Sequence, residues 1–80
     1  MENLQKLKHA FSEGLSIPID QVNEDLKYQG IAEWDSMSHL FLIKEIENSF
    51  GLSIQTEDIL EMTSFNNAKD ILHKLDVTFN

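Results

Sequence analysis

Four consecutive residues, Trp34-Asp35-Ser36-Met37, carry the side chains with the clearest chemical potential in this chain. They stand where a loop containing Gly30 meets an apolar stretch with helical spacing. A hydroxyl at the start of a helix ordinarily caps it by accepting a bond from a backbone N–H group. Such a serine is also exposed, beside free N–H groups and a helix dipole that favour an anion. Ser36 is therefore either a helix cap or a site that receives a covalent group.

Catalysis by Ser36 itself is not expected. A nucleophilic serine needs a base that a third group orients, together with an oxyanion hole. His39 lies three residues further along, but the sequence lacks the Gly-x-Ser-x-Gly turn that presents such a serine. The other histidines, His9 and His73, are too far away for metal-ligand spacing, and cysteine is absent. All three histidines are expected at the surface or its boundary. We expect a protein that is not an enzyme and holds no metal.

Length and composition limit the class of protein. The chain has 80 residues, 41% of them hydrophobic, which suits one domain with an economical core. Its formal net charge is −8 and it contains no arginine, so a nucleic acid partner is not expected. A signal peptide pattern is absent, and the longest apolar run, residues 40–43, is too short to cross a bilayer. We expect a single monomeric domain over residues 1–80, located in the cytoplasm and not inserted in a membrane.

The acidic residues are concentrated in the segment 33–61, which contains seven acids and one base, or a charge of −6. The acids are Glu33, Asp35, Glu45, Glu47, Glu57, Asp58 and Glu61, and the base is Lys44. Such a segment is either a solvated surface or a face that attracts basic partner proteins.

The first half of the chain predicts one helix followed by a long loop. Apolar residues at helical spacing (Leu4, Leu7 and Phe11) predict a helix over residues 2–13, which Gly14 is expected to end. Residues 15–35 contain Pro18 and are typical of a crossover loop with one helical turn near residues 20–26. The apolar anchors of this loop are expected to be Leu15, Val22, Leu26 and Ile31.

The clearest predicted element is a second helix over residues 36–50, ended by Gly51. Its core stripe is expected to contain Leu40, Ile43, Ile46 and Phe50. Met37 and Phe41 project away from this stripe. They either pack against the preceding loop or form an exposed docking patch beside Ser36.

Two further helices complete the prediction. A short helix over residues 56–61 has Thr56 as its expected cap, and the last helix is expected to be capped by Ser64 or Asn66. The buried face of the last helix is expected to contain Ala68, Ile71, Leu72 and Leu75. Residues 77–80 are expected to fray. The predicted fold is all-α, a small four-helix bundle with three longer helices and one short helix.

The segment Asp35-Ser36-Met37 resembles the Asp-Ser-Leu attachment motif of acyl carrier proteins and of related peptidyl and aminoacyl carriers. The similarity covers about residues 2–76 and includes Phe50-Gly51 and the pattern Thr63-x-Phe65-x-x-Ala68. The resemblance implies an acyl-carrier-protein-like bundle. It also implies that a phosphopantetheinyl transferase attaches 4′-phosphopantetheine from coenzyme A to Ser36. The thiol of this arm would carry acyl or related cargo as a thioester, as in fatty acid biosynthesis, to acyl-loading and acyl-using enzymes.

The same resemblance suggests roles for other residues. Asp35, Met37, Phe41 and Glu47 match positions that contact partner enzymes. Ile54, Ile59 and Met62 are candidates for the lining of an acyl pocket.

The chain also departs from the pattern of carriers in fatty acid synthases. Phe41 stands where those carriers have glutamate, Lys44 where they have an apolar residue, and Asn48 where they have an acid. We therefore expect a specialised biosynthetic pathway. Methionine after the serine also occurs in D-alanyl carriers, so aminoacyl cargo is an alternative. An unmodified helical interaction domain is a second alternative.

Overall fold

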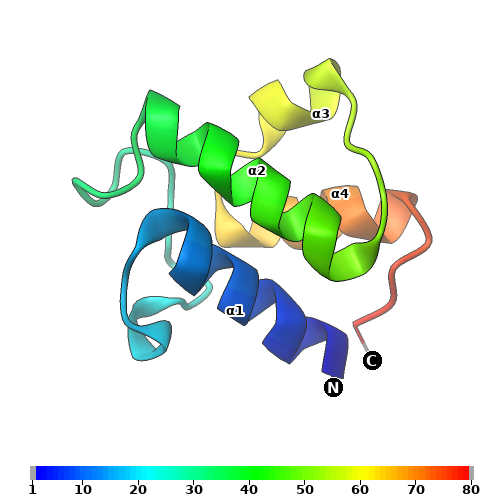
Figure 1. Cartoon of the computed structure of the whole chain (residues 1–80), viewed down its shortest axis with the longest axis horizontal. Helices are drawn as coiled ribbons and strands as arrows, with labels where there is room; N and C mark the ends of the chain where they lie inside the picture. Colours follow the sequence, from blue (N-terminus) through cyan, green and yellow to red (C-terminus); the bar gives the residue numbers. More distant parts are fainter. Residues whose placement is uncertain (1, 80) are drawn as a thin grey trace.

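The computed structural model describes residues 2–79 and contains four α-helices and one short 3₁₀ helix in that range (Figure 1). The elements are α1 (Glu2–Leu15), η1 (Ile19–Gln21), α2 (Ser36–Phe50), α3 (Thr56–Glu61) and α4 (Phe65–Lys74). Between residues 2 and 79 no strand forms, and the one isolated bridge joins Lys27 to Ser64. The predicted all-α architecture is therefore confirmed. Over the same residues, every helix is too short or too polar to cross a membrane.

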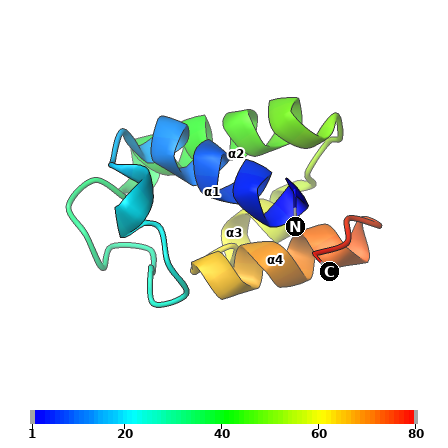
Figure 2. The ribbon, with the colours of Figure 1, turned by 90° about the horizontal axis from the view of Figure 1, so that it is seen from below.

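Helices α1 and α2 pack side by side, and α4 runs on the other side of the molecule with the short α3 near it (Figure 2). The core joins these layers through aromatic side chains. The ring of Phe11 in α1 lies 5.3 Å from Trp34, just before α2, and 5.0 Å from Phe65 in α4, both edge to face. Trp34 is fully buried. One side chain of α1 thus links the segment that carries Ser36 to the last helix.

Helix α1 continues through Gly14, so the prediction that this glycine ends the helix is wrong. A Cβ atom at Gly14 would lie 2.6 Å from the Cα atom of Leu42 in α2. The missing side chain therefore lets the two backbones approach closely. The helix ends at Leu15 and is followed by Ser16 in the left-handed conformation, with φ of 56°. The Ile17 N–H group donates to the Ser12 carbonyl at 3.1 Å.

The crossover loop keeps its predicted anchors but not its predicted helical turn. Val22 and Leu26 are buried and Ile31 is half-buried. The helical residues are Ile19–Gln21, at the beginning of the predicted range 20–26. The turn ends early because the Asn23 side chain accepts the Asp25 N–H bond at 2.9 Å, which competes with helical bonding.

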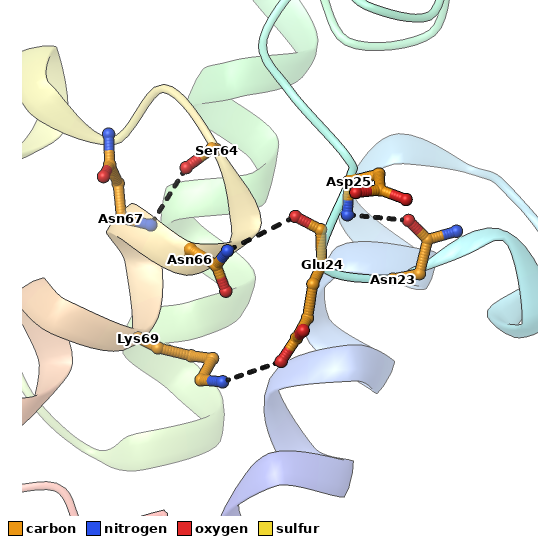
Figure 3. A network of polar contacts seen from close by, with 7 residues as sticks. All are labelled: Asn23, Glu24, Asp25, Ser64, Asn66, Asn67 and Lys69. Atoms are coloured by element: carbon orange, nitrogen blue, oxygen red, sulfur yellow. Dashed lines mark hydrogen bonds and ion pairs between the residues drawn. The ribbon is translucent and has the colours of Figure 1, made fainter.

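Polar contacts fasten this loop to the beginning of α4 (Figure 3). The Glu24 carbonyl accepts from the Asn66 side chain at 3.5 Å, and its carboxylate pairs with Lys69 at 3.4 Å. The Phe65 N–H group also donates to the Leu26 carbonyl at 3.0 Å. Exposed ion pairs contribute little to stability. The backbone bond beside the buried Leu26 is therefore the firmer of these attachments.

Helix α2 has the predicted bounds, and Gly51 ends it in the left-handed conformation with φ of 63°. Its buried residues are Leu42, Ile43 and Ile46. Leu40 was expected in the core but is 64% exposed, so this prediction is wrong. At 100° per residue Leu40 projects about 120° away from Ile46, and the stripe includes Leu42 in its place.

The caps of the last two helices differ from each other. The Ser64 hydroxyl accepts from the Asn67 N–H group at 3.0 Å, which confirms Ser64 as the cap of α4. Thr56 is the first helical residue of α3 and not its cap, because Gln55 holds the capping position without a side-chain bond. The buried residues of α4 are Phe65, Ala68, Ile71 and Leu72, and Leu75 is half-buried after the helix.

The C-terminal tail packs on the bundle over residues 77–79, where fraying was expected. Val77 is buried. The Thr78 carbonyl accepts from the Asn3 side chain at 2.8 Å, and the ring of Phe79 lies 6.5 Å from that of Phe50. The two ends of the chain therefore lie close together (Figure 1). Residue 80 of the predicted tail lies outside the described residues.

Candidate functional site

Ser36 is the first residue of α2, and its side chain is exposed. It does not cap the helix, because the Asp35 carboxylate accepts the Ser38 N–H bond at 2.9 Å. This hydrogen bond lowers the pKa of the Asp35 carboxyl below its ordinary value, since it favours the charged form. The expectation that the N–H groups of the first turn are free to face a phosphate therefore fails at Ser38. The Ser36 hydroxyl itself is left available.

Tyr28 is the polar neighbour of Ser36 that sequence reasoning missed. Its hydroxyl lies 3.0 Å from the Ser36 Oγ atom. The backbone holds Tyr28 in place, because its N–H group donates to the Thr63 carbonyl at 2.8 Å. A tyrosine eight residues before the serine gives no signal in the sequence. Only the path of the crossover loop brings the two hydroxyls together.

His39 joins three segments of the chain beneath Ser36. Indole N–H groups only donate, so Trp34 Nε1 donates to His39 Nδ1 at 2.9 Å. The opposite nitrogen, Nε2, then carries the proton and donates to the Ile59 carbonyl at 2.8 Å. Both ring nitrogens thus form hydrogen bonds with groups other than Ser36. His39 serves as a bridge between the loop, α2 and α3, and it is not placed as a base for the serine. His9 and His73 are exposed, as expected.

Large apolar side chains are exposed on α2 after Ser36 and on α3. Met37 is 70% exposed and Phe41 is 60% exposed, so these two point to solvent and do not pack against the loop. Leu40 (64%) and Leu60 in α3 (74%) join them. We call Met37, Leu40, Phe41 and Leu60 the apolar patch. Sequence reasoning found two of its members. It placed Leu40 in the core, and it did not single out Leu60.

The acidic segment divides into acids with local partners and acids facing solvent. The Glu47 carboxylate, a predicted partner contact, accepts from the Ile54 N–H group at 2.7 Å and so holds the loop after α2. Asp58 pairs with Lys74 at 3.2 Å. Asp35 also has a local partner, the Ser38 N–H group, but its side chain is exposed, as are Glu33, Glu57 and Glu61. Their negative charge lies on the segments that also carry Ser36 and the apolar patch.

Two of the three predicted pocket residues line a hollow near the serine. The hollow has a volume of about 130 Å³, and its walls are Tyr28, His39, Ile59, Leu60, Met62 and Thr63. Ile54, the third predicted residue, is buried but does not line it. A larger hollow of about 630 Å³, between the end of α3 and α4, includes Asn67, Asp70 and Lys74. Ser36 and its hydrogen-bond partner Tyr28 are not among its residues.

Among the described residues, no three His, Cys, Asp or Glu side chains are grouped closely enough to hold a metal ion. The chain matches no protein-family model. The site therefore consists of an exposed serine with a tyrosine hydroxyl beside it, set between an apolar patch and exposed acids.

Proposed function

We propose that this protein is a carrier of the acyl-carrier-protein type. In this proposal Ser36 bears 4′-phosphopantetheine, and the thiol of that arm holds acyl or related cargo as a thioester. The protein catalyses nothing itself and presents the cargo to the enzymes that load it and use it. Among the described residues no polar or charged one is buried, which is compatible with this role, because a carrier needs a display surface more than a catalytic cavity.

The observation that carries the proposal is that the Ser36 hydroxyl is exposed and does not cap the helix. A serine at a helix start is normally explained by capping. Here Asp35 takes that role with its 2.9 Å bond to the Ser38 N–H group, so capping does not account for Ser36. The side chain is exposed at the end of a helix, where a transferase can reach it. This supports an attachment site over a purely local role.

The residues around Ser36 fit a phosphate ester in one respect and oppose it in another. The Tyr28 hydroxyl, 3.0 Å from Ser36 Oγ, is a donor that can serve an oxygen of the ester. The Asp35 carboxylate is a like charge next in sequence to the phosphate. The lowered pKa of Asp35 keeps this carboxylate charged, so the repulsion persists, and solvent and salt screen it because the side chain is exposed.

The surface beside the serine indicates what kind of partner surface would bind there. The apolar patch suits a partner with an apolar socket, and the exposed acids suit a basic rim around that socket. Phe41, which stands where fatty-acid-synthase carriers have glutamate, makes this surface more apolar than their acidic face. Partners are selected by what a surface lacks as well as by what it offers. We therefore infer a dedicated pathway with its own loading enzyme, and either acyl or aminoacyl cargo.

The attachment is tested by intact mass after incubation with coenzyme A and a promiscuous phosphopantetheinyl transferase. The wild-type chain is expected to gain one phosphopantetheine, and Ser36→Ala none. Ser53→Ala is the matched control, since Ser53 is an exposed serine outside the helices and its loss should leave the gain intact. A wild-type chain that stays unmodified would rule out the proposal.

The apolar patch favours a second candidate, an unmodified interaction domain that uses these side chains for binding. The rate of loading separates the two functions. In a carrier, Phe41→Asp is expected to reduce kcat/KM of the transferase while helical content stays unchanged, because Phe41 is 60% exposed. Asn48→Asp introduces the same charge two turns further from Ser36 and should have less effect. If the chain is never loaded, the interaction domain is the better explanation.

A further inference from the structure

The hollow beside Ser36 is small, with a volume of about 130 Å³. Tyr28 forms part of its wall and also contacts the Ser36 hydroxyl at 3.0 Å, so the hollow adjoins the attachment point. Met62, another wall residue, is fully buried. Ile59 and Leu60 of α3 complete the apolar part of the lining. A flexible arm attached to Ser36 can fold back and place its end here.

A chain of hydrogen bonds joins two wall residues of this hollow, His39 and Ile59, to the buried Trp34. Trp34 donates to His39 at 2.9 Å, and His39 donates to the Ile59 carbonyl at 2.8 Å, which ties α2 to α3. A long chain that entered between the two helices would have to separate them. That would break the bond from His39 to the Ile59 carbonyl and leave two part-buried polar groups without partners, which costs free energy. The bridge therefore limits the depth that cargo can reach.

The volume sets the size of the group that fits. An apolar cavity of about 150 Å³ holds one benzene molecule, or about six non-hydrogen atoms. The hollow of about 130 Å³ is slightly smaller than this. None of its six lining residues is an aspartate, glutamate, lysine or arginine. A charged end group would therefore lose water without gaining an ionic partner.

We propose that this carrier serves an uncharged short-chain acyl group of about two to six carbon atoms, seated in this hollow. Long fatty acyl chains stay outside the bundle. The proposal rests on the proposed function and narrows its cargo. His39 is the residue that sets the limit, through its bonds to Trp34 and Ile59.

The test is a chain-length series loaded on Ser36 from the corresponding acyl coenzyme A thioesters: acetyl, butyryl, hexanoyl, octanoyl and decanoyl. Intact mass verifies each loading, and thermal unfolding gives Tm relative to the free-thiol form. Each methylene that enters the hollow is expected to raise Tm by roughly 3–6 °C. The rise should end between four and six carbons, and longer chains should add nothing. Succinyl has four carbons and a carboxylate, and it should raise Tm less than butyryl does.

A rise that continues through octanoyl would overturn the proposal, as would a series in which no chain raises Tm. Failure of the loading itself, seen by mass, would instead contradict the proposed function. His39→Ser removes the bridge and should allow octanoyl to raise Tm above butyryl. His73→Ser makes the same change at an exposed position in α4 and should keep the wild-type pattern. If His39→Ser does not fold, the wild-type series alone decides.

Discussion

The inner and outer faces of α2 both carry large apolar side chains, yet only the inner face is covered. Leu42, Ile43 and Ile46 are at most 4% exposed, whereas Met37, Leu40 and Phe41 are 60–70% exposed. The inner face lies against α1, whose Gly14 allows close approach at Leu42. The outer face borders Ser36 and solvent. Hydrophobic character alone therefore does not decide which side of this helix becomes core; the neighbouring helix does.

The two faces also differ in what they contribute to folding. Burying an apolar side chain of this size gains about 1.5–3 kcal/mol, whereas one that stays mostly exposed gains little. The outer residues thus contribute little to stability, and their place beside Ser36 is explained better by binding a partner. Substitutions of residues on one face at a time test this difference.

The largest effect is expected on the inner face. Ile46→Ala removes a fully buried side chain from the contact of α2 with α1 and should lower the free energy of unfolding by about 2–5 kcal/mol. Urea denaturation followed by circular dichroism measures this loss. The total free energy of unfolding of a small domain is roughly 5–15 kcal/mol. The variant should therefore unfold at a much lower urea concentration than the wild type.

Leu40→Ala is the matched control on the outer face. Leu40 lies in the same helix but is 64% exposed, so its loss should change stability by no more than about 0.5 kcal/mol. Equal destabilisation by the two substitutions would show that Leu40 belongs to the core, as its spacing first suggested. The comparison between the faces would then fail.

A smaller effect is expected at Gly14. Gly14→Ala places a Cβ atom 2.6 Å from the Leu42 Cα atom, so one of the two helices must shift. Overpacking of this kind lowers the free energy of unfolding by about 1–3 kcal/mol, whereas the helix propensity of alanine raises it by roughly 1 kcal/mol. We therefore expect a net loss of stability.

The control for this change is Gln5→Ala, on an exposed position of the same helix. Its effect should be near zero or slightly favourable. Thermal unfolding of both variants measures the difference. A Gly14→Ala variant more stable than wild type would mean that α1 and α2 can separate without cost, and the inner face would be looser than its burial indicates.

The elements themselves were largely predictable, and two of the failures, at Gly14 and Leu40, share one cause. The bounds of α2 follow from a change of apolar spacing at Ser36 and a left-handed glycine at Gly51. Gly14 and Leu40 were misassigned because each has two local explanations. A glycine can end a helix or admit a neighbour, and a helix with apolar residues on more than one face can turn either of them inward. Only the position of the partner helix decides.

The candidate site was predictable where it depends on helix ends and not where it depends on the loop. The exposure of Ser36 follows from its place at the beginning of α2. The Tyr28 contact and the bridge from Trp34 through His39 to Ile59 depend on where residues 16–35 pass and where α3 lies. Neither position is encoded in local spacing.

The smallest effect is expected at the polar end of α2, where stability comes from a charged hydrogen bond and not from burial. Hydrogen bonds from the Ser38 backbone lower the pKa of Asp35 below its ordinary value of 3.8 in the folded state. The unfolded chain therefore takes up the proton first as the pH falls. The contribution of Asp35 is complete above the unfolded pKa and is lost as the pH falls through the lower folded pKa.

Asp35→Asn tests this, because asparagine also caps helices but does not titrate. Urea denaturation of both proteins at several pH values between 7 and 2.5 gives their difference in stability. We expect the difference to stay constant from pH 7 to about pH 5 and to change below about pH 4, with the wild type losing its advantage. A difference that does not vary with pH would mean that the carboxylate cap adds nothing as a charge. The Ser36 end of α2 would then depend on packing, as its inner face does.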